Sequence, residues 1–303
     1  MNPPPEGRTV AGLKGDTRVL ALLGDPVRHS LSPAMQNAAF VAAGVNGVYV
    51  TLRCGDGDLP GLLRGLARAG GGGNVTLPHK ERAAAAVEEA TSAVRRTGAC
   101  NTFWLEEGRV HGDNTDVEGL RRALHALLDQ DLQGARVLLL GAGGAARAAL
   151  TVLMDESAGA VHILNRTLSR ARNLAQRLGD ANTRVLESRE ALAGRRYDLV
   201  VNATRLGLDP EDPLPMEVDE VDRVGAILDL VYGPEETALV RRARERDIPA
   251  ADGGEMLLQQ GAVAFERWWK RPAPVEVMRR TFEAHRSSDP PQSGEPDGGG
   301  VAR

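Results

Sequence analysis

The chain has 303 residues, enough for two domains of ordinary size that each bury a core. Its formal net charge is −4 and only 3% of its residues are aromatic, which argues against nucleic acid or an anionic membrane surface as a partner. The two cysteines, Cys54 and Cys100, cannot build a disulfide framework and suit a reducing cytoplasm.

The two ends of the chain differ in composition from the rest. Residues 1–16 contain no apolar core segment, so we expect no secretory signal there. We predict that residues 1–16 and 287–303 are disordered tails, because they have too little apolar surface to offset the entropy lost on ordering. The most apolar stretch, residues 137–154, is interrupted by glycines and Arg147 and is not a membrane span.

Between the tails, strand-like and helix-like patterns alternate, which predicts an α/β fold. We expect residues 17–115 to form the first domain. Its strand at RVLALLG precedes a helix at LSPAMQNAAFVAAG, with Ser32 at the N-cap, Pro33 at the first helical position and Gly44 at the end. The later elements are a strand at GVYVTLRC, a helix at LPGLLRGLARAG, a strand at GNVT, an alanine-rich helix from about His79, and a hairpin at NTFWLEEGRVHGDNT turning at Glu107 and Gly108.

The stretch NVTLPHK, residues 74–80, gathers polar side chains directly behind a run of four glycines. It is either a solvated turn or a place where these groups converge on a small polar molecule. Asn74 and Thr76 are two apart on a strand, so they share one face. Lys80 begins the next helix. His79 is the polar group that a substrate site needs least, and we expect it to face away from that site.

The pattern of strands and helices in residues 116–252 predicts a doubly wound nucleotide-binding domain. The helix at DVEGLRRALHALL is expected to bridge the two domains. Strands at ARVLLL, VHILN, TRVLE, DLVVNAT, AILDL and IPAAD, with helical segments between most of them, give the six strands that such a domain has. The last helices, EMLLQQGAVAFERWWKR and PVEVMRRTFEAHR within residues 253–286, are expected to pack back on the first domain and complete it.

The stretch GAGGAARA, between a strand and a helix, predicts a dinucleotide site. Gly141 and Gly143 have the G-x-G spacing, and Ala146 takes the third position. Glycine lets a pyrophosphate approach the backbone, and the helix N-terminus offers free N–H groups to it. The alternative is a glycine-rich turn that binds nothing.

The next strand ends in LNRTLSR, which favours NADP over NAD. An NAD site usually places a carboxylate near this point, on the ribose 2′-hydroxyl. This chain has Asn165 and Arg166 there, with Arg170 four residues on. A guanidinium can pair with a 2′-phosphate. The alternative is a solvated helix start with ordinary arginines.

The motifs GDPVRHSLSPAMQN, NVTLPHK, GACNT, GDNTD, GAGGAARA, NRTLSR, NAT, DLVY and DGGEML occur in this order. Together they resemble the shikimate dehydrogenase family, from about Arg18 to about Arg286. The resemblance implies a substrate domain and a Rossmann NADP domain, with the substrate in the cleft between them. It implies no metal.

The resemblance also implies roles for individual residues. Ser30 and Ser32 would hold the substrate carboxylate, although Ser32 could equally be a simple N-cap. The other substrate positions are Asn74, Thr76, Asn101, Asp116, Tyr232 and Gln260. Tyr232 could instead be core packing, and Gln259 leaves the register of Gln260 open. The cofactor positions are Gly141, Gly143, Gly144, Ala145, Asn165, Arg166, Thr167, Arg170, Thr204 and Gly253.

Lys80 and Asp116 match the catalytic pair of the family. Reducing a ketone needs a hydride on carbon and a proton on oxygen. A lysine ammonium can polarise the carbonyl and stabilise the developing alkoxide, and a neighbouring carboxylate would orient it. Which of the two residues donates the proton is left open. The alternative for Lys80 is an ordinary surface lysine at a helix start.

The chain departs from the family pattern at three places. Gln36 replaces a common histidine and is expected to be structural. Arg205 and Leu208 replace a small or apolar residue and a methionine near the nicotinamide end of the cofactor site. Arg205 could contact a phosphate or point to solvent.

The activity that the resemblance implies is NADPH-dependent, reversible reduction of 3-dehydroshikimate to shikimate, in a cytoplasmic monomer or homodimer. A quinate or aminoshikimate dehydrogenase is the nearest alternative, although the two serines of SLS resemble the shikimate type. A ligand sensor without catalysis is a second alternative, but it would be expected to lack Lys80 and Asp116. An oxidoreductase linked to folate or tRNA would not contain HSLSP or NVTLPHK.

Overall fold

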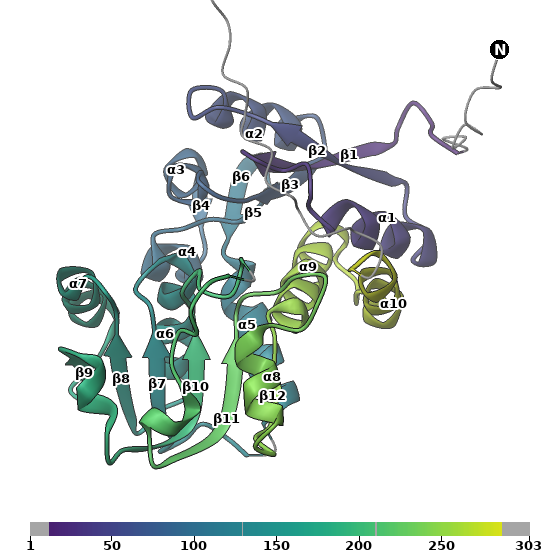
Figure 1. Ribbon diagram of the computed structural model, residues 1–303. Helices are drawn as coiled ribbons and strands as arrows, with labels where there is room; N and C mark the ends of the chain where they lie inside the picture. The colour runs from purple at the N-terminus through teal and green to yellow at the C-terminus, as the bar shows by residue number, and fades with distance from the viewer. Residues whose placement is uncertain (1–11, 129, 210, 287–303) are drawn as a thin grey trace, which may run out of the picture.

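The computed structural model describes residues 12–128, 130–209 and 211–286, and it forms two sheets flanked by helices (Figure 1). The predicted two-domain α/β class is confirmed. Residues 1–11 and 287–303, which cover most of the two predicted tails, lie outside the described residues. The predicted domain boundaries stay a prediction, although the change from one sheet to the other falls at α5.

The first sheet is mixed and has the order β2-β1-β3-β5-β6-β4. Its hairpin turns at Glu107 and Gly108, which both have positive φ, as predicted. Two short elements, β4 and α4, were not predicted. The elements of this part are β1 (Arg18–Gly24), α1 (Ser32–Ala42), β2 (Gly47–Arg53), α2 (Leu59–Arg68), β3 (Gly72–Val75), α3 (Lys80–Ala86), β4 (Glu89–Ala90), α4 (Ser92–Thr97), β5 (Thr102–Glu106) and β6 (Arg109–Asp113).

The second sheet confirms the six predicted strands. They are all parallel, in the order β12-β11-β10-β7-β8-β9, which is the order of a doubly wound dinucleotide-binding sheet. Its elements are α5 (Thr115–Leu127), β7 (Arg136–Leu140), α6 (Gly144–Asp155), β8 (Ala160–Leu164), α7 (Leu168–Leu178), β9 (Thr183–Leu186), η1 (Arg189–Leu192), β10 (Arg196–Asn202), η2 (Val218–Glu220), β11 (Arg223–Asp229), α8 (Ala238–Arg244) and β12 (Ala250–Ala251).

The start of α1 differs from the prediction by one residue. The helix begins at Ser32, so Leu31 is the N-cap and no side chain caps the helix in the usual way. The N–H of Ser32 instead donates to Ser30 Oγ at 3.2 Å. Ser30 Oγ reaches the N-terminal end of α1 because the chain bends at Leu31, between Ser30 and Ser32. Ser32 is therefore not the N-cap, and its hydroxyl is not used for that purpose.

The last two helices, α9 (Gly254–Trp269) and α10 (Val275–Arg286), return to the first domain as predicted. Phe265 and Trp268 of α9 are buried in one cluster with Leu20 of β1 and Phe40 of α1. The indole N–H of Trp268 donates to the Phe103 carbonyl of β5 at 3.2 Å. The C-terminal helices thus supply a large share of the first domain's core.

Helices α5 and α9 cross closely between the two sheets (Figure 1). A methyl group added at Gly119 of α5 would lie 2.6 Å from the backbone nitrogen of Gln260. Only glycine lets the two backbones approach this far. The crossing matters for function because α5 also carries Asp116 in its first turn.

Replacing Gly119 with alanine is therefore expected to destabilise the fold by about 1–3 kcal/mol, because the helices must move apart. Gly65→Ala is the matched control. It also adds a methyl to a helix, but nothing lies within 4 Å of it. The control should be stabilised by up to about 1 kcal/mol, since alanine is the better helix former. Urea unfolding of both variants checks this, and equal shifts of the two midpoints would contradict the close crossing.

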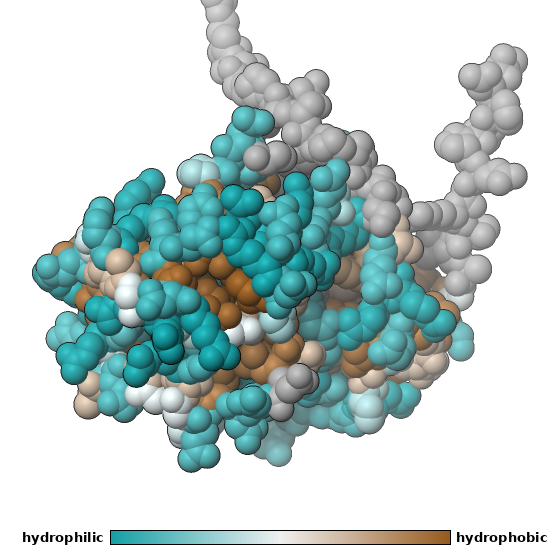
Figure 2. Space-filling view, turned by 60° about the horizontal axis from the view of Figure 1, so that its bottom comes forward, coloured by the Kyte–Doolittle hydropathy of each residue, from teal (hydrophilic) through white to brown (hydrophobic). Residues whose placement is uncertain are grey.

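The surface in Figure 2 is largely hydrophilic, and hydrophobic residues show mainly in its recessed parts. Among the described residues, no helix combines the length and apolar character that a membrane span requires.

Candidate active site

Lys80 and Asp116 come together between the two domains. Lys80 is the first residue of α3, and its Nζ donates to Asp116 Oδ2 at 2.6 Å. Both side chains keep some solvent contact, with 26% of Lys80 and 15% of Asp116 exposed. An ammonium and a carboxylate in this arrangement can orient each other and still reach a bound molecule. The two residues are 36 positions apart in the chain, so the fold creates the pair.

Asn101 holds Asp116 from the other side. Its Nδ2 donates to Asp116 Oδ1 at 2.8 Å. Its Oδ1 accepts from the N–H of Thr115 at 2.8 Å and from the Thr115 hydroxyl at 3.1 Å. Asn114 contributes as well, because its Oδ1 accepts the Asp116 N–H at the start of α5. The Asp116 carboxylate is thus held by Asn101, which directly precedes β5, and the Asp116 backbone is held by Asn114 at the start of α5.

Asn74 is buried in the same network. Its Oδ1 accepts from the Tyr49 hydroxyl at 2.7 Å, and its Nδ2 donates to the Asn101 carbonyl and to Thr102 Oγ1. Its hydrogen-bonding groups are therefore already engaged within the protein. Thr76 lies one residue beyond β3 and still pairs with β1 through its backbone N–H, which donates to the Leu23 carbonyl at 2.9 Å. Substrate contact by Asn74 and Thr76 stays a prediction.

His79 is separated from the lysine pair, as expected. It is 3% exposed, and its Nδ1 lies 2.6 Å from Asp56 Oδ1 while its Nε2 lies 2.8 Å from the Cys54 carbonyl. Both ring nitrogens are thus used to hold the loop after β2. His79 has a structural position beside the site.

The two serines of HSLS lie at the start of α1. Ser32 is buried and Ser30 is half-buried. Gln36, one turn further, donates from Nε2 to the Gly261 carbonyl of α9 at 2.8 Å. This contact supports the expectation that Gln36 is structural, because it fixes the serine-bearing helix to α9.

Gln260 of α9 approaches the same region. Its Oε1 lies 3.5 Å from Thr115 Oγ1, and its Nε2 donates to the Leu257 carbonyl. The amide of Gln259 is instead engaged by Glu255 at 2.8 Å. Of the two neighbouring glutamines, Gln260 is therefore the one beside the Asn101 network.

Tyr232 packs against the C-terminal helices, with its ring 6.3 Å from that of Phe282 at 62°. Burial raises the pKa of the Tyr232 hydroxyl, so it stays protonated. Its position agrees with the core-packing alternative, and contact with a ligand stays a prediction.

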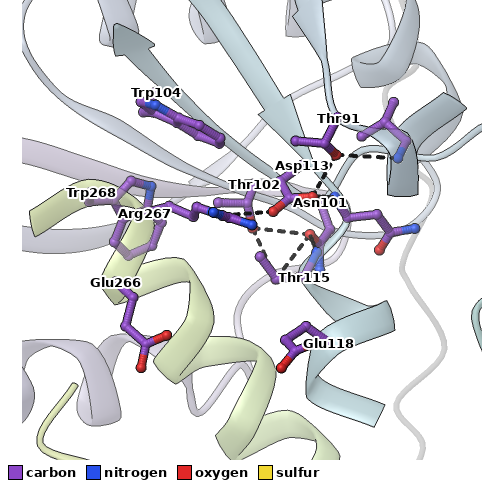
Figure 3. A network of polar contacts seen from close by, with 12 residues as sticks. Thr91, Asn101, Thr102, Trp104, Asp113, Thr115, Glu118, Glu266, Arg267 and Trp268 are labelled. Atoms are coloured by element: carbon purple, nitrogen blue, oxygen red, sulfur yellow. Dashed lines mark hydrogen bonds and ion pairs between the residues drawn. The ribbon is translucent and has the colours of Figure 1, made fainter. Parts of the chain in front are cut away.

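A further network fixes α9 to the segment that leads to Asp116 (Figure 3). The buried Asp113 accepts from Arg267 Nε at 2.9 Å, from Thr91 Oγ1 at 2.6 Å and from the Asn114 N–H at 2.8 Å. Arg267 follows Asp113 by 154 residues, so the contact joins α9 to β6. This network holds α9 against the end of β6, three residues before Asp116.

The glycine-rich turn has the geometry that a dinucleotide needs. Gly141 has φ 106°, and a methyl group there would lie 2.7 Å from the Ala203 carbonyl oxygen. A methyl group at Gly143 would meet nothing within 4 Å, so the N-terminus of α6 faces open space. Gly144 and Ala145 form the first turn of that helix, whose free N–H groups suit a pyrophosphate.

A cavity of about 370 Å³ opens beside Gly143, between α6, α7 and the α3–α4 region. Its charged lining residues are Glu81, Arg96, Arg147, Arg170 and Arg177. Arg147 is ion-paired with Glu81 across the two domains. The side chains of Arg170 and Arg177 form no hydrogen bond or ion pair with any residue that the structure describes. The cavity therefore offers unpaired positive charge to an anion.

The loop after β8 carries the remaining residues of the predicted phosphate site. Asn165 Nδ2 donates to the Thr167 carbonyl at 2.8 Å, which shapes the turn into α7. Arg166 and Thr167 are exposed at this turn. The residues present thus fit the 2′-phosphate of NADP, because this turn has no carboxylate to repel the phosphate and has arginines beside it.

The far end of the predicted cofactor site is formed by the strand ends of β10 and β11. Thr204 donates from Oγ1 to Asn202 Oδ1 at 2.7 Å. A methyl group at Gly253 would lie 2.3 Å from the Leu230 carbonyl oxygen, so glycine is required there. Arg205 and Leu208 are exposed in the loop after β10.

Several residues of the site were not predicted from the sequence. Thr115 and Asp113 lie inside GDNTD, one and three residues before Asp116, but nothing in the motif shows that they bond to Asn101 and Arg267. Arg147 lies one helical turn after Gly143, and that spacing could have indicated a place near the phosphates. Arg177 lies two turns after Arg170 on the same face of α7.

Three family models match the chain in order. They are the shikimate dehydrogenase substrate binding domain at residues 22–103, shikimate / quinate 5-dehydrogenase at residues 123–207, and the shikimate 5′-dehydrogenase C-terminal domain at residues 253–281.

Curated relatives and a solved structure agree with these matches. A shikimate dehydrogenase (NADP(+)) of Methanopyrus kandleri is 40% identical over 279 residues, covering 89% of this chain and 96% of the relative. A shikimate dehydrogenase (NADP(+)) of Rubrobacter xylanophilus is 42% identical over 281 residues, covering 90% of this chain and 98% of the relative. The crystal structure of shikimate 5-dehydrogenase from Thermus thermophilus in complex with NADP(H) and shikimate superposes with a TM-score of 0.79 at 38% identity, covering 88% of this chain and 98% of that one.

Proposed function

The chain belongs to the shikimate dehydrogenase family, and we propose that it catalyses the reversible, NADP-dependent reduction of 3-dehydroshikimate to shikimate. The observation that carries the proposal is the contact between Lys80 Nζ and Asp116 Oδ2 at 2.6 Å. It lies between the predicted substrate domain and the helix that leads into the nucleotide domain. A sensor that had lost catalysis would not need this pair.

The chemistry divides between cofactor and protein. NADPH supplies the hydride when it is bound. The Lys80 ammonium would donate a hydrogen bond to the substrate carbonyl oxygen and stabilise the negative charge that develops on it. Asp116 orients the ammonium, and Asn101 holds Asp116. The proton that completes the hydroxyl comes from the Lys80–Asp116 pair, which takes it back in the oxidation direction.

The substrate would lie against this pair, with its carboxylate at Ser30 and Ser32 and its ring hydroxyls near Asn101 and Gln260. A hydroxyl group can donate to a carboxylate, and the N-terminal end of α1 adds a favourable dipole. The networks around Gln36 and Asp113 keep α1 and α9 in fixed positions relative to these groups.

The deciding experiment is an assay of the purified protein with shikimate or quinate, each with NADP or NAD. Of the four combinations, we expect the oxidation of shikimate with NADP to be the fastest. Faster rates with quinate would identify a quinate dehydrogenase, and faster rates with NAD would contradict the proposed cofactor. No turnover with any pair, together with tight binding of shikimate, would favour a sensor.

The NADP preference can be tested at Arg170, whose guanidinium has no partner among the described residues and lines the cavity beside Gly143. Arg170→Gln is expected to weaken NADP binding by about 10- to 100-fold, since a charge-assisted hydrogen bond to phosphate contributes about 1.5–3 kcal/mol. NAD binding should change little, because NAD lacks the 2′-phosphate.

The matched control for Arg170 is Arg172→Gln on the same helix. Arg172 is paired with Glu187 at 2.9 Å and does not line the cavity. Isothermal titration calorimetry of NADP and NAD against both variants gives the comparison. An equal loss of NADP affinity in the two variants would remove Arg170 from the phosphate site.

We also infer a cytoplasmic location and a monomer or homodimer. Both cysteines are free and buried, and burial raises the pKa of the Cys100 thiol to about 12. Such thiols suit a reducing compartment. Light scattering after size exclusion decides the oligomeric state, and an assembly larger than a dimer would contradict the inference.

A further inference from the structure

Asp229, the last residue of β11, is a fully buried carboxylate that the proposed reaction does not use. Its Oδ1 accepts from Asn202 Nδ2 at 2.8 Å and from the Val231 N–H at 3.1 Å. Its Oδ2 accepts from the Thr237 hydroxyl at 2.7 Å. Among the residues that the structure describes, none forms an ion pair with it.

A buried negative charge without a cationic partner is costly. Burial accordingly raises the pKa of Asp229 to about 6, and the charge of Asp252 adds to the effect. Every contact of this carboxylate in the fold is with an uncharged donor: one amide, one backbone N–H and one hydroxyl. An asparagine could accept from Asn202 and Val231 with its oxygen, and its amide could donate to the Thr237 hydroxyl, whose oxygen also accepts the Val240 N–H at the start of α8. A carboxylate at this position therefore calls for another explanation.

The network of Asp229 supports two loops at the carboxyl end of the sheet. Asn202 Nδ2 also donates to the Leu206 carbonyl at 3.2 Å, and Asn202 Oδ1 accepts from the Thr204 N–H at 3.0 Å. The loop after β10 is therefore folded over the carboxylate. A methyl group at Gly207 would lie only 4.0 Å from Asp229 Oδ2.

The second loop is the one after β11. The Val231 N–H is held by Asp229, and the Val231 carbonyl accepts from the Gly253 N–H at 2.9 Å at the start of α9. In a doubly wound sheet the dinucleotide crosses the carboxyl ends of the strands, with its two halves on the two halves of the sheet. The adenosine half would belong to β8 and α7 here, so the nicotinamide half would belong to the ends of β10 and β11.

We propose that Asp229 is a positioning residue for the nicotinamide half of the cofactor, and that its buried charge favours the oxidised cofactor over the reduced one. The oxidised nicotinamide ring is a cation and the reduced ring is neutral. A charge inside the protein acts on such a cation over several ångströms, because the interior screens it less than water does. The proposal rests on the proposed function, since it requires NADP.

The test is Asp229→Asn, with binding of NADP⁺, NADPH and 2′,5′-ADP measured by calorimetry at pH 8. Affinity for 2′,5′-ADP, which lacks the nicotinamide, should stay within about twofold. Affinity for NADP⁺ should fall about tenfold, and affinity for NADPH should fall clearly less. An unchanged ratio of NADP⁺ to NADPH affinity would overturn the proposal. Failure of all three ligands to bind the unmodified chain would instead overturn the proposed function.

Asp212→Asn is the matched control. Asp212 also holds the loop after β10, accepting from the Gly207 N–H at 3.0 Å and the Asp209 N–H at 3.2 Å, but it is only half-buried. Its substitution should leave the ratio of NADP⁺ to NADPH affinity unchanged. A shift equal to that of Asp229→Asn would show that any disturbance of the loop changes the ratio, and would also overturn the charge argument.

A second measurement needs no variant. The ratio of NADP⁺ to NADPH affinity is compared at pH 5 and pH 8 in the unmodified chain. With a pKa of about 6, Asp229 would be largely protonated at pH 5, so the preference for NADP⁺ should weaken there, while effects on the 2′-phosphate cancel because both forms carry it. Among the described residues, the charged group that acts on Asp229 is Asp252, which is ion-paired with Arg286. A ratio independent of pH would contradict the proposal.

Discussion

Replacing Lys80 with alanine is expected to lower kcat by about 10³-fold or more, because the proposed mechanism then loses both the ammonium at the reacting oxygen and the proton path through the pair. The fold should survive. Lys80 is partly exposed at the first position of α3, and alanine is a good helix former. Initial rates of shikimate oxidation measure the loss, and calorimetry with NADP checks that cofactor binding is retained.

The matched control is Lys270→Ala, at an exposed lysine that pairs with Glu106 at 2.9 Å, away from the Asn101 network. It should keep nearly full turnover. If Lys80→Ala retained turnover within a few-fold of the unmodified chain, Lys80 would have no catalytic role. If NADP affinity fell together with kcat, the loss would be one of binding or folding.

The sequence predicted the elements of the fold well, because most of them carry strong local signals. Most of the six strands of the second sheet are apolar runs that end at polar residues or glycine, and all six are present. The hairpin at Glu107 and Gly108 was equally clear, since glycine takes positive φ readily. β4 has two residues and pairs with β6 in parallel, so it leaves no periodic pattern to read.

The site was predicted less completely than the fold. Lys80 and Asp116 were paired through the family resemblance, because no local pattern connects residues that far apart. The contacts that hold the pair were not foreseen. Asn101 bonds to Thr115 and Asp113 bonds to Arg267, and each contact depends on how separate elements pack. The one-residue error at Ser32 has the same origin, since the bend that brings Ser30 Oγ to the helix end is a local tertiary feature.

Asp116→Asn should reduce kcat by about 10²–10⁴-fold, because the amide is uncharged and cannot take part in proton transfer. The two present contacts also conflict with an amide. Both Lys80 Nζ and Asn101 Nδ2 are donors, so the nitrogen of an asparagine would face one of them. Steady-state rates measure the effect. Glu118→Gln on the same helix, at a carboxylate paired with Arg121 and Arg122, is the control and should have nearly normal rates.

Combining the two substitutions distinguishes a catalytic unit from two independent contributors. If Lys80 and Asp116 act together, the variant with both changes should be about as slow as the slower single variant, because removing either member already disables the pair. Independent roles would make the two losses multiply. A multiplied loss would therefore contradict the assignment of one proton path to the pair, and would leave Asp116 with a role in holding the substrate alone.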